Sequence, residues 1–195
     1  MTQPPLPDTL TLMQRDGLPD ALRSLIKAYP RDGWERNAHY SQLIAFWLDR
    51  HLMCRRLLDQ LDQDAKAALD GKEEHERDKR KLSHFGGMLI NQLHGHHQIE
   101  DAQYFPIMSQ LDKGIAQGFE ILDADHHALD GILSSLADAA NGVLRHAGPT
   151  SGFVDQTAAF KAELDAFHPM LNRHLIDEEE LVVPVLLKYD PPQFR

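Results

Sequence analysis

HHQIEDAQYFP at residues 96–106 and HLIDEEELVVP at residues 174–184 share one pattern. In each, a histidine is followed by acids four and five residues later and by a proline ten residues later. The apolar residues before the two copies also correspond: Leu82, Leu89 and Leu93 precede the first, and Phe160, Phe167 and Leu171 precede the second. Residues at these spacings share one face of an α-helix, so each copy predicts part of a long amphipathic helix. We interpret the chain as a duplicated helical hairpin.

Two further apolar stripes of helical spacing each contain one histidine. The first consists of Ile44, Trp47, His51, Cys54, Leu58, Leu61, Ala65 and Ala68. The second consists of Phe119, Leu122, His126, Leu129, Leu133, Leu136, Ala140 and Val143. No segment alternates with the period of two that is typical of a half-buried strand. The predicted fold is all-α, an antiparallel up-down four-helix bundle over residues 38–190, preceded by a linker and a short extra helix, residues 18–29, within residues 1–37.

Composition excludes several classes of function. The 195 residues carry a net charge of -10, which disfavours nucleic acid and anionic membrane as partners. No apolar run is long enough to span a bilayer and the first residues do not form a signal peptide, so we expect a cytoplasmic protein. Cys54 is the only cysteine, which excludes an intrachain disulfide and a thiolate zinc site. Twelve histidines remain to be explained.

The four striped histidines are expected at one level of the bundle. His51 lies 20 residues before a predicted turn at Gly71, and His96 lies 25 residues after it. His126 and His174 each lie about 24 residues from a second predicted turn near Thr150. At about 1.5 Å per residue, antiparallel helices bring all four to a similar depth, roughly 35 Å from the turns.

Two of these histidines have a glutamate one helical turn later. His96 with Glu100, and His174 with Glu178, each direct an imidazole and a carboxylate into the same space. The acids at offset five, Asp101 and Glu179, point elsewhere and are interpreted as outer or surface groups. Two buried carboxylates facing each other are unfavourable unless a cation lies between them. Imidazole and carboxylate ligands without sulfur suit iron, manganese or zinc, and paired carboxylates in a helix bundle are typical of di-iron proteins.

These residues resemble the hemerythrin-like proteins with HHE cation-binding domains, over residues 39–188. The resemblance implies two non-haem iron ions joined by an oxo or hydroxo bridge, one bound by His51 and His96 and the other by His126 and His174. Glu100 and Glu178 would bridge them, and zinc or manganese could replace iron. Dioxygen, nitric oxide or peroxide would be the small-molecule partner; the redox partner and a homodimer stay open.

This chain departs from the oxygen-carrying members in one position. In those proteins the histidine that corresponds to His126 is followed four residues later by a second histidine, whereas this chain has Asp130 at that position. A site with four histidines and two glutamates favours ferric iron and turnover over stable oxygenation. Related repair proteins often take one more histidine from outside the motif. In this chain the candidates for that histidine are His75, His84, His97 and His127, and Asp130 is a candidate acidic ligand.

Spacing separates these extra candidates. His84 is excluded if its helix is unbroken, and His75 requires the segment after Gly71 to fold back. His97 and His127 lie about 100° from a proposed ligand, so each is a ligand, an outer partner or a flank of the pocket. The remaining histidines, His39, His94, His146 and His168, are predicted on the surface. Pro169 is expected to kink or restart the last helix.

Three hypotheses about function follow. The first is a di-iron protein that binds or reacts with dioxygen, nitric oxide or peroxide in sensing, storage or stress response. The second is a redox enzyme, for example one that repairs iron-sulfur centres. The third is a metal-free helical interaction module in which the histidines are packing residues.

Overall fold

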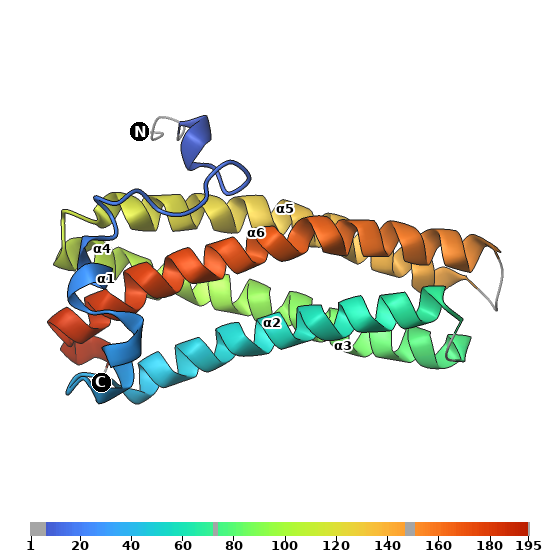
Figure 1. The fold of residues 1–195 in the computed structure, drawn as a ribbon, viewed down its shortest axis with the longest axis horizontal. Coiled ribbons are helices and arrows are strands. Elements are labelled where there is room, and N and C mark those ends of the chain that lie inside the picture. Colours follow the sequence, from blue (N-terminus) through green and yellow to red (C-terminus); the bar gives the residue numbers. More distant parts are fainter. Residues whose placement is uncertain (1–6, 72–73, 147–150, 195) are drawn as a thin grey trace. The chain divides into compact units, whose positions relative to one another are not determined.

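All regular structure in the described part of the chain is helical. The computed structural model describes residues 7–71, 74–146 and 151–194. The short helices are η1 (Asp8–Leu10), α1 (Ser24–Ala28), η2 (Arg31–Arg36), α4 (Phe105–Leu111) and η4 (Pro192–Phe194). The long helices are α2 (Gln42–Leu69), α3 (His75–Ile99), α5 (Ala116–Arg145) and α6 (Ser151–Tyr189), with a π-helical turn, η3 (Glu100–Tyr104), between α3 and α4 (Figure 1). The expectation of an all-helical fold is confirmed, and the up-down order of four helices stays a prediction.

The chain forms two compact units, and each long helix contributes to both. The first unit comprises Met1–His51, His97–Ala128 and Asn172–Arg195. The second comprises Leu52–His96 and Leu129–Leu171. The predicted division of the chain at residue 37 stays a prediction.

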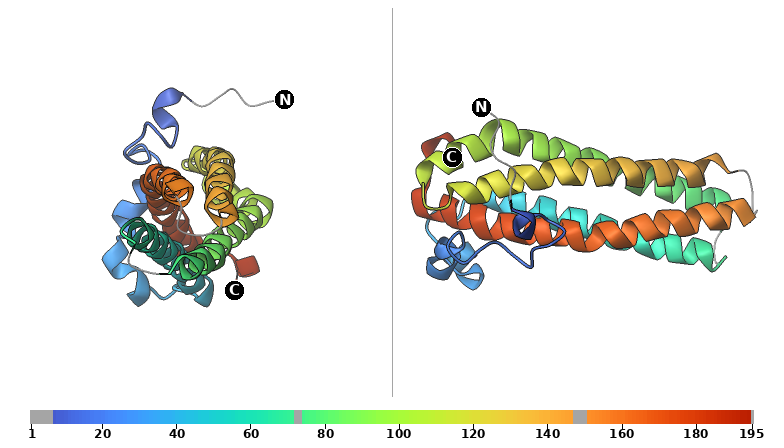
Figure 2. Two further views of the ribbon diagram at one scale, coloured as in Figure 1. Left: turned by 90° about the vertical axis from the view of Figure 1, so that its right-hand side faces the viewer. Right: turned by 90° about the horizontal axis from the view of Figure 1, so that it is seen from above.

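The first unit has a core of large apolar side chains. Residues that precede α2, such as Leu18, Leu22 and Trp34, pack there with apolar residues of α4, α5 and α6. The segment that supplies them crosses α6, as two further views show (Figure 2). Hydrogen bonds from Arg15, Arg23 and Arg31 to carboxylates of α5 and α6 fix this segment.

The second unit is a packing of four helical segments. Its buried side chains include Leu58, Leu61, Leu89, Leu93, Leu129, Leu133, Phe160, Leu164, Phe167 and Leu171. Ion pairs connect the helices at its surface: Lys81 Nζ lies 3.0 Å from Asp64 Oδ1, and Lys161 Nζ lies 3.2 Å from Asp62 Oδ1.

The predicted stripes agree with burial. The apolar residues, histidines and glutamates named for the four stripes are buried, except His96 and Ala140, which are half-buried. The turn at Gly71 is also confirmed, because α2 ends at Leu69 and Gly71 adopts a φ of +64°, which favours glycine. The second predicted turn, near Thr150, lies outside the described residues.

Two local predictions were wrong. The helix expected over residues 18–29 is only Ser24–Ala28, because the residues before it bond to α6 through their side chains and the Leu18 amide. Pro169 was expected to kink or restart the last helix, and the restart is wrong, because α6 continues through the proline. Phe167 and Leu171 on either side of the proline are fully buried, and this packing maintains the helix despite the missing N–H.

Within residues 7–71, 74–146 and 151–194, no helix has the length and apolar character needed to cross a membrane.

Candidate metal centre

The π-helical turn positions the acidic residue of the first repeat. Pro106 has no N–H to donate to the carbonyl four residues earlier, and the Phe105 amide instead bonds to the carbonyl of Glu100, five residues earlier. Glu100 at the start of this turn is completely buried. Single π-turns of this kind occur frequently at functional sites.

Glu178 lies between two of the predicted histidines. Its Oε2 is 3.4 Å from Nε2 of His51 and 3.4 Å from Nε2 of His174, which is one turn earlier on α6. The indole Nε1 of Trp47 donates a hydrogen bond to the other oxygen, Oε1. His51, Glu100 and Glu178 offer ligand atoms within 4.8 Å of one another. These three form the first group of the site.

A second group consists of three buried histidines. His97, His126 and His174 offer ring nitrogens within 4.8 Å of one another. The rings of His97 and His126 stack with centroids 4.0 Å apart. Nε2 of His126 lies 3.6 Å from Oε2 of Glu100, so Glu100 connects this group to the first as Glu178 does.

Each of three histidines has a carboxylate on its outer nitrogen, Nδ1. The partners are Asp101 for His126 at 2.7 Å, Glu179 for His51 at 3.0 Å and Asp125 for His174 at 3.2 Å. A carboxylate accepts, so Nδ1 carries a proton, and Nε2 is the nitrogen that is directed to the interior and can bind a metal when deprotonated. Carboxylates in this position orient metal-binding histidines in many proteins.

The electrostatics of the site reflect its buried acids. Burial lowers the pKa of His174, but the hydrogen bond to Asp125 and the nearby carboxylate of Glu178 outweigh burial and raise that pKa to about 9. In the same way, Glu178 and Glu179 overcome burial and raise the pKa of His51. Burial raises the pKa of Asp125, but hydrogen bonds from Arg15 and His174 lower it below its usual value. Without metal, protons on His51 and His174 therefore balance nearby acids, and a bound cation would displace those protons.

The donor set fits a metal ion. Among the described residues, the buried Nε2 atoms of His126 and His174 make no hydrogen bond, although carboxylate oxygens lie 3.6 and 3.4 Å away. Unsatisfied buried nitrogens facing acids at these separations are costly unless something binds between them. Ring nitrogens and carboxylate oxygens without sulfur suit iron, manganese and zinc.

Five of the six predicted ligands lie in these two groups, all in the first unit: His51, Glu100, His126, His174 and Glu178. The sixth, His96, is half-buried on α3, one turn before Glu100 and directly before His97. It is the last residue of the second unit, and its part in the site stays a prediction.

The structure distinguishes among the residues considered as additional metal ligands. His97 is buried and belongs to the second group, whereas His127 is exposed and bonds the Asp123 carbonyl. Asp130 is exposed too and lies 3.8 Å from His94. The alternative in which His75 folds back onto the metals is wrong, because His75 begins α3 and its ring lies 3.8 Å from that of Phe153 in the second unit.

Sequence reasoning missed three residues of the surroundings. Trp47 was assigned only to the core, although its place one turn before His51 on the same stripe could have indicated the contact with Glu178. No sequence pattern marked Asp125 or Arg15 as a neighbour of the metal centre. They pair across 110 residues of sequence, and no local pattern predicts such a contact.

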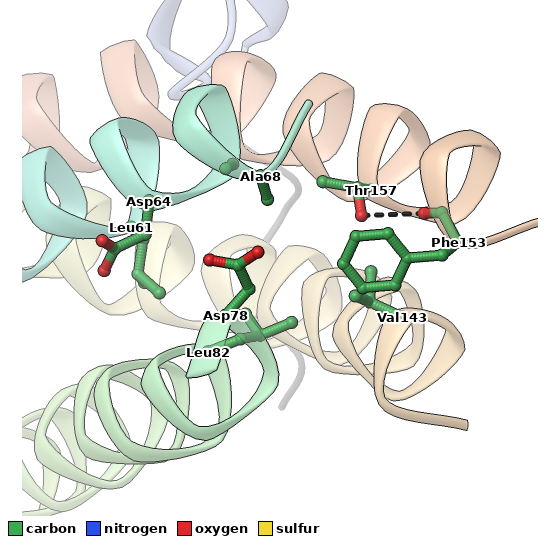
Figure 3. A pocket seen from close by; sticks show the side chains of 9 residues that line it. Leu61, Asp64, Ala68, Asp78, Leu82, Val143, Phe153 and Thr157 are labelled. Atoms are coloured by element: carbon green, nitrogen blue, oxygen red, sulfur yellow. Dashed lines mark hydrogen bonds between the residues drawn. The ribbon is translucent and has the colours of Figure 1, made fainter. Parts of the chain in front are cut away.

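A separate pocket in the second unit offers different chemistry (Figure 3). Its lining is mostly apolar and includes the carboxylates of Asp64 and Asp78 but no histidine. Asp64 is paired with Lys81, and the Thr157 hydroxyl donates to the Phe153 carbonyl at 2.8 Å. This pocket therefore lacks the mixed ligands of the site in the first unit.

Comparison with known families agrees with the geometry. The family model described as the hemerythrin HHE cation-binding domain matches residues 42–186. The chain belongs to the hemerythrin HHE family. No curated protein and no solved structure matches the chain. The hemerythrin-like domain thus spans all the histidines and glutamates of the two groups, whereas Arg15, Arg23 and Arg31 precede it.

Proposed function

We propose that this hemerythrin-like chain binds two non-haem iron ions and uses them to react with dioxygen, nitric oxide or peroxide. One ion is held by His51 and His96, and the other by His97, His126 and His174. Glu100 and Glu178 bridge the two. His97 is thus added to the ligands expected from sequence.

The position of Glu178 carries this proposal. One carboxylate oxygen lies at an equal 3.4 Å from Nε2 of His51 in the first group and of His174 in the second. Trp47 holds the other oxygen and so restrains the carboxylate. A carboxylate shared by two sets of histidines is the arrangement that a bridged pair of ions requires.

The outer carboxylates support turnover over reversible oxygen binding. Three imidazoles donate a hydrogen bond from Nδ1 to a carboxylate, which makes each a stronger electron donor at Nε2. The carboxylates belong to Asp101, Glu179 and Asp125. Three such donors, together with two glutamates, stabilise the higher oxidation state of a bound metal. When bound, an iron pair supplies one-electron and dioxygen chemistry.

A surface groove of the first unit supports access for a small reactant. Asp101 and Phe105 belong to its lining, which otherwise comes from α4 and the start of α5. Asp101 is the hydrogen-bond partner of His126, and the ring of Phe105 stacks over the same imidazole with centroids 5.4 Å apart. The groove therefore extends to the two side chains that contact the imidazole of His126.

Two adjacent histidines of α5 provide the test. The purified chain is loaded anaerobically with ferrous iron, and iron per chain and the near-ultraviolet charge-transfer band after oxidation are measured. His126→Gln should lose most of one iron and weaken the band, whereas the control His127→Gln, at an exposed position, should match the unmodified chain. Absence of bound iron in the unmodified chain, or retention of zinc or manganese in preference, would overturn the assignment to iron.

A second measurement separates turnover from binding. With a reductant present, the loaded protein should consume many equivalents of peroxide, dioxygen or nitric oxide per iron pair. A stable adduct that forms and dissociates reversibly, without consumption, would contradict turnover but leave the metal centre in place. A metal-free interaction module would instead show no metal and only small stability changes in Glu100→Gln and Glu178→Gln.

A further inference from the structure

The segment that precedes α2 places arginines on the outer side of the metal centre. Arg15 is buried, with 7% of its surface exposed, although it lies in an irregular stretch. Its guanidinium donates to both oxygens of Asp125, one of them at 2.7 Å, and through Nε to Asp177 at 2.9 Å. A buried guanidinium with a bidentate carboxylate partner is geometrically specific.

Arg15 reaches a proposed ligand through one intermediate. Oδ2 of Asp125, which accepts from Arg15 Nη2, also accepts from Nδ1 of His174. A continuous chain of hydrogen bonds therefore runs from the guanidinium through the carboxylate to the imidazole. Within it, Asp125 cannot turn away from His174 without breaking its pairing with the arginine.

We call such a chain of hydrogen bonds, from an arginine through a carboxylate to a histidine, a relay. A second relay ends on the first group of the site, at His51. Arg31 Nη1 donates to Oε2 of Glu179, and Oε1 of the same carboxylate accepts from Nδ1 of His51 at 3.0 Å. The Arg31 side chain is half-exposed and the Glu179 side chain is buried. The two arginines are 16 residues apart and serve histidines of different groups.

We propose that residues 8–36 form an arginine strap in which Arg15 and Arg31 are positioning residues. Through Asp125 and Glu179 they orient His174 and His51 and set how strongly these histidines donate to the metals. This inference rests on the proposed di-iron function and goes beyond the matched domain, because the strap precedes residue 42.

The physical effect has a definite sign. An arginine draws electron density from its carboxylate, which then accepts less strongly from the imidazole N–H. The imidazole is therefore a weaker donor, and the nearby positive charge further disfavours ferric iron relative to ferrous iron. Removing the arginine should favour the ferric state, and the freed carboxylate should hold the histidine less firmly.

The strap contains its own control. Arg23 Nε donates to Glu180 Oε2 at 2.8 Å, so it also joins the strap to α6 by an arginine–carboxylate pair. The two residues lie in the same segments as the relays, but within the described part of the chain Glu180 makes no hydrogen bond or ion pair with a proposed ligand. Arg23→Gln therefore removes the same charge and a similar contact without cutting a relay.

The experiment compares Arg15→Gln, Arg31→Gln and Arg23→Gln in the full, iron-loaded chain. Loss of ferrous iron to a chelator and the midpoint potential of the iron pair are measured. We expect the first two variants to lose iron roughly 10- to 100-fold faster. We also expect their ferric-to-ferrous ratio at a fixed potential to rise about tenfold, which corresponds to about 59 mV lower potential. The control should change neither quantity.

Further variants protect the test against a folding defect. Arg15→Gln removes the arginine partner of the buried Asp125 and one of the two arginine partners of Asp177, so it is expected to be strongly destabilised. Arg31→Gln removes a half-exposed arginine, so it carries the test if the first variant does not fold. The double variant Arg31→Gln with Glu179→Gln should be no worse than Glu179→Gln alone, because both changes cut the same relay.

The outcomes distinguish the two proposals. If the unmodified chain retains no iron, the proposed function fails and the strap inference falls with it. If the unmodified chain holds two irons but Arg15→Gln or Arg31→Gln matches Arg23→Gln in both readouts, only the strap inference is overturned. Additive effects of Arg31→Gln and Glu179→Gln would also overturn it.

Discussion

Replacing Trp47 with phenylalanine tests whether Glu178 is held for metal binding. The substitution removes the indole N–H that donates to Glu178 Oε1 but keeps an aromatic ring at this position. In the unmodified chain the centroid of the Trp47 ring lies 4.9 Å from that of Tyr104. Trp34 supplies a matched control. Both tryptophans are 3% exposed in the first unit, and Trp34 Nε1 donates at 2.8 Å to the Tyr29 carbonyl, which is uncharged.

The magnitude follows from the two acceptors. A hydrogen bond to a charged group contributes about 1.5–3 kcal/mol, and one between neutral groups about 1 kcal/mol. Both substitutions remove the same atoms from equally buried sites, so the losses of apolar burial largely cancel. We expect Trp47→Phe to lower the free energy of unfolding by about 1 kcal/mol more than Trp34→Phe. Because Glu178 would also lose a restraint, metal affinity should fall roughly 10- to 100-fold in Trp47→Phe alone.

Urea unfolding of the metal-free variants gives the first quantity, and competition with a chelator of known affinity gives the second. Metal affinity is the deciding readout, because Trp34 also stacks under Arg31, with the guanidinium carbon 4.7 Å from its ring, and this contact affects stability. Equal metal affinity in the two variants would refute the idea that Trp47 restrains a bridging carboxylate.

Three further outcomes are expected. Leu89 is completely buried in the second unit, so Leu89→Ala should lower the free energy of unfolding by about 2–5 kcal/mol in urea titrations; a loss within error would contradict its burial. Burial raises the pKa of Asp112, but bonds from Lys188, Tyr189 and the Gly114 amide lower it below its usual value. Its contribution to stability is therefore present above about pH 4 and is lost as the pH falls through the lowered pKa. Lys188→Gln should shift the carboxyl titration of Asp112, followed by NMR, to higher pH, and an unchanged titration would refute the pairing. Ferrous iron at 1,000 times its Kd should stabilise the metal-free chain by about 4 kcal/mol, seen as a chelator-reversible rise in Tm, and a constant Tm would argue against a folded metal site.

The long helices were predictable because their apolar residues recur at helical spacing. That periodicity identified the buried face of α2, α3, α5 and α6. Local rules failed where tertiary contacts outweighed them. Pro169 predicted a break, but buried neighbours on both sides keep α6 continuous. Residues 18–23 predicted a helix, but the Leu18 amide and the Arg23 side chain instead bond to carboxylates of α6.

The candidate site was predictable as far as the duplication reached. Two copies of one pattern predicted His174 and Glu178 together with their counterparts, His96 at the end of α3 and Glu100 at the start of η3. A helical wheel cannot show which neighbouring helix faces each of two consecutive histidines, so the role of His97 required the structure. The relays could not be predicted, because Arg15 and Asp125 are separated by 110 residues of sequence and neither belongs to a periodic pattern.

The burial of Arg15 has a practical consequence for recombinant work. A fragment trimmed to residues 42–186 would keep Asp125, Asp177 and Glu179 but lack Arg15 and Arg31, so Asp177 would retain only its pairing with Arg173. Buried acids without a cation either take up protons or draw water into the core. Such a fragment would be expected to express poorly or to bind metal abnormally, so the first 41 residues should be retained when the protein is produced.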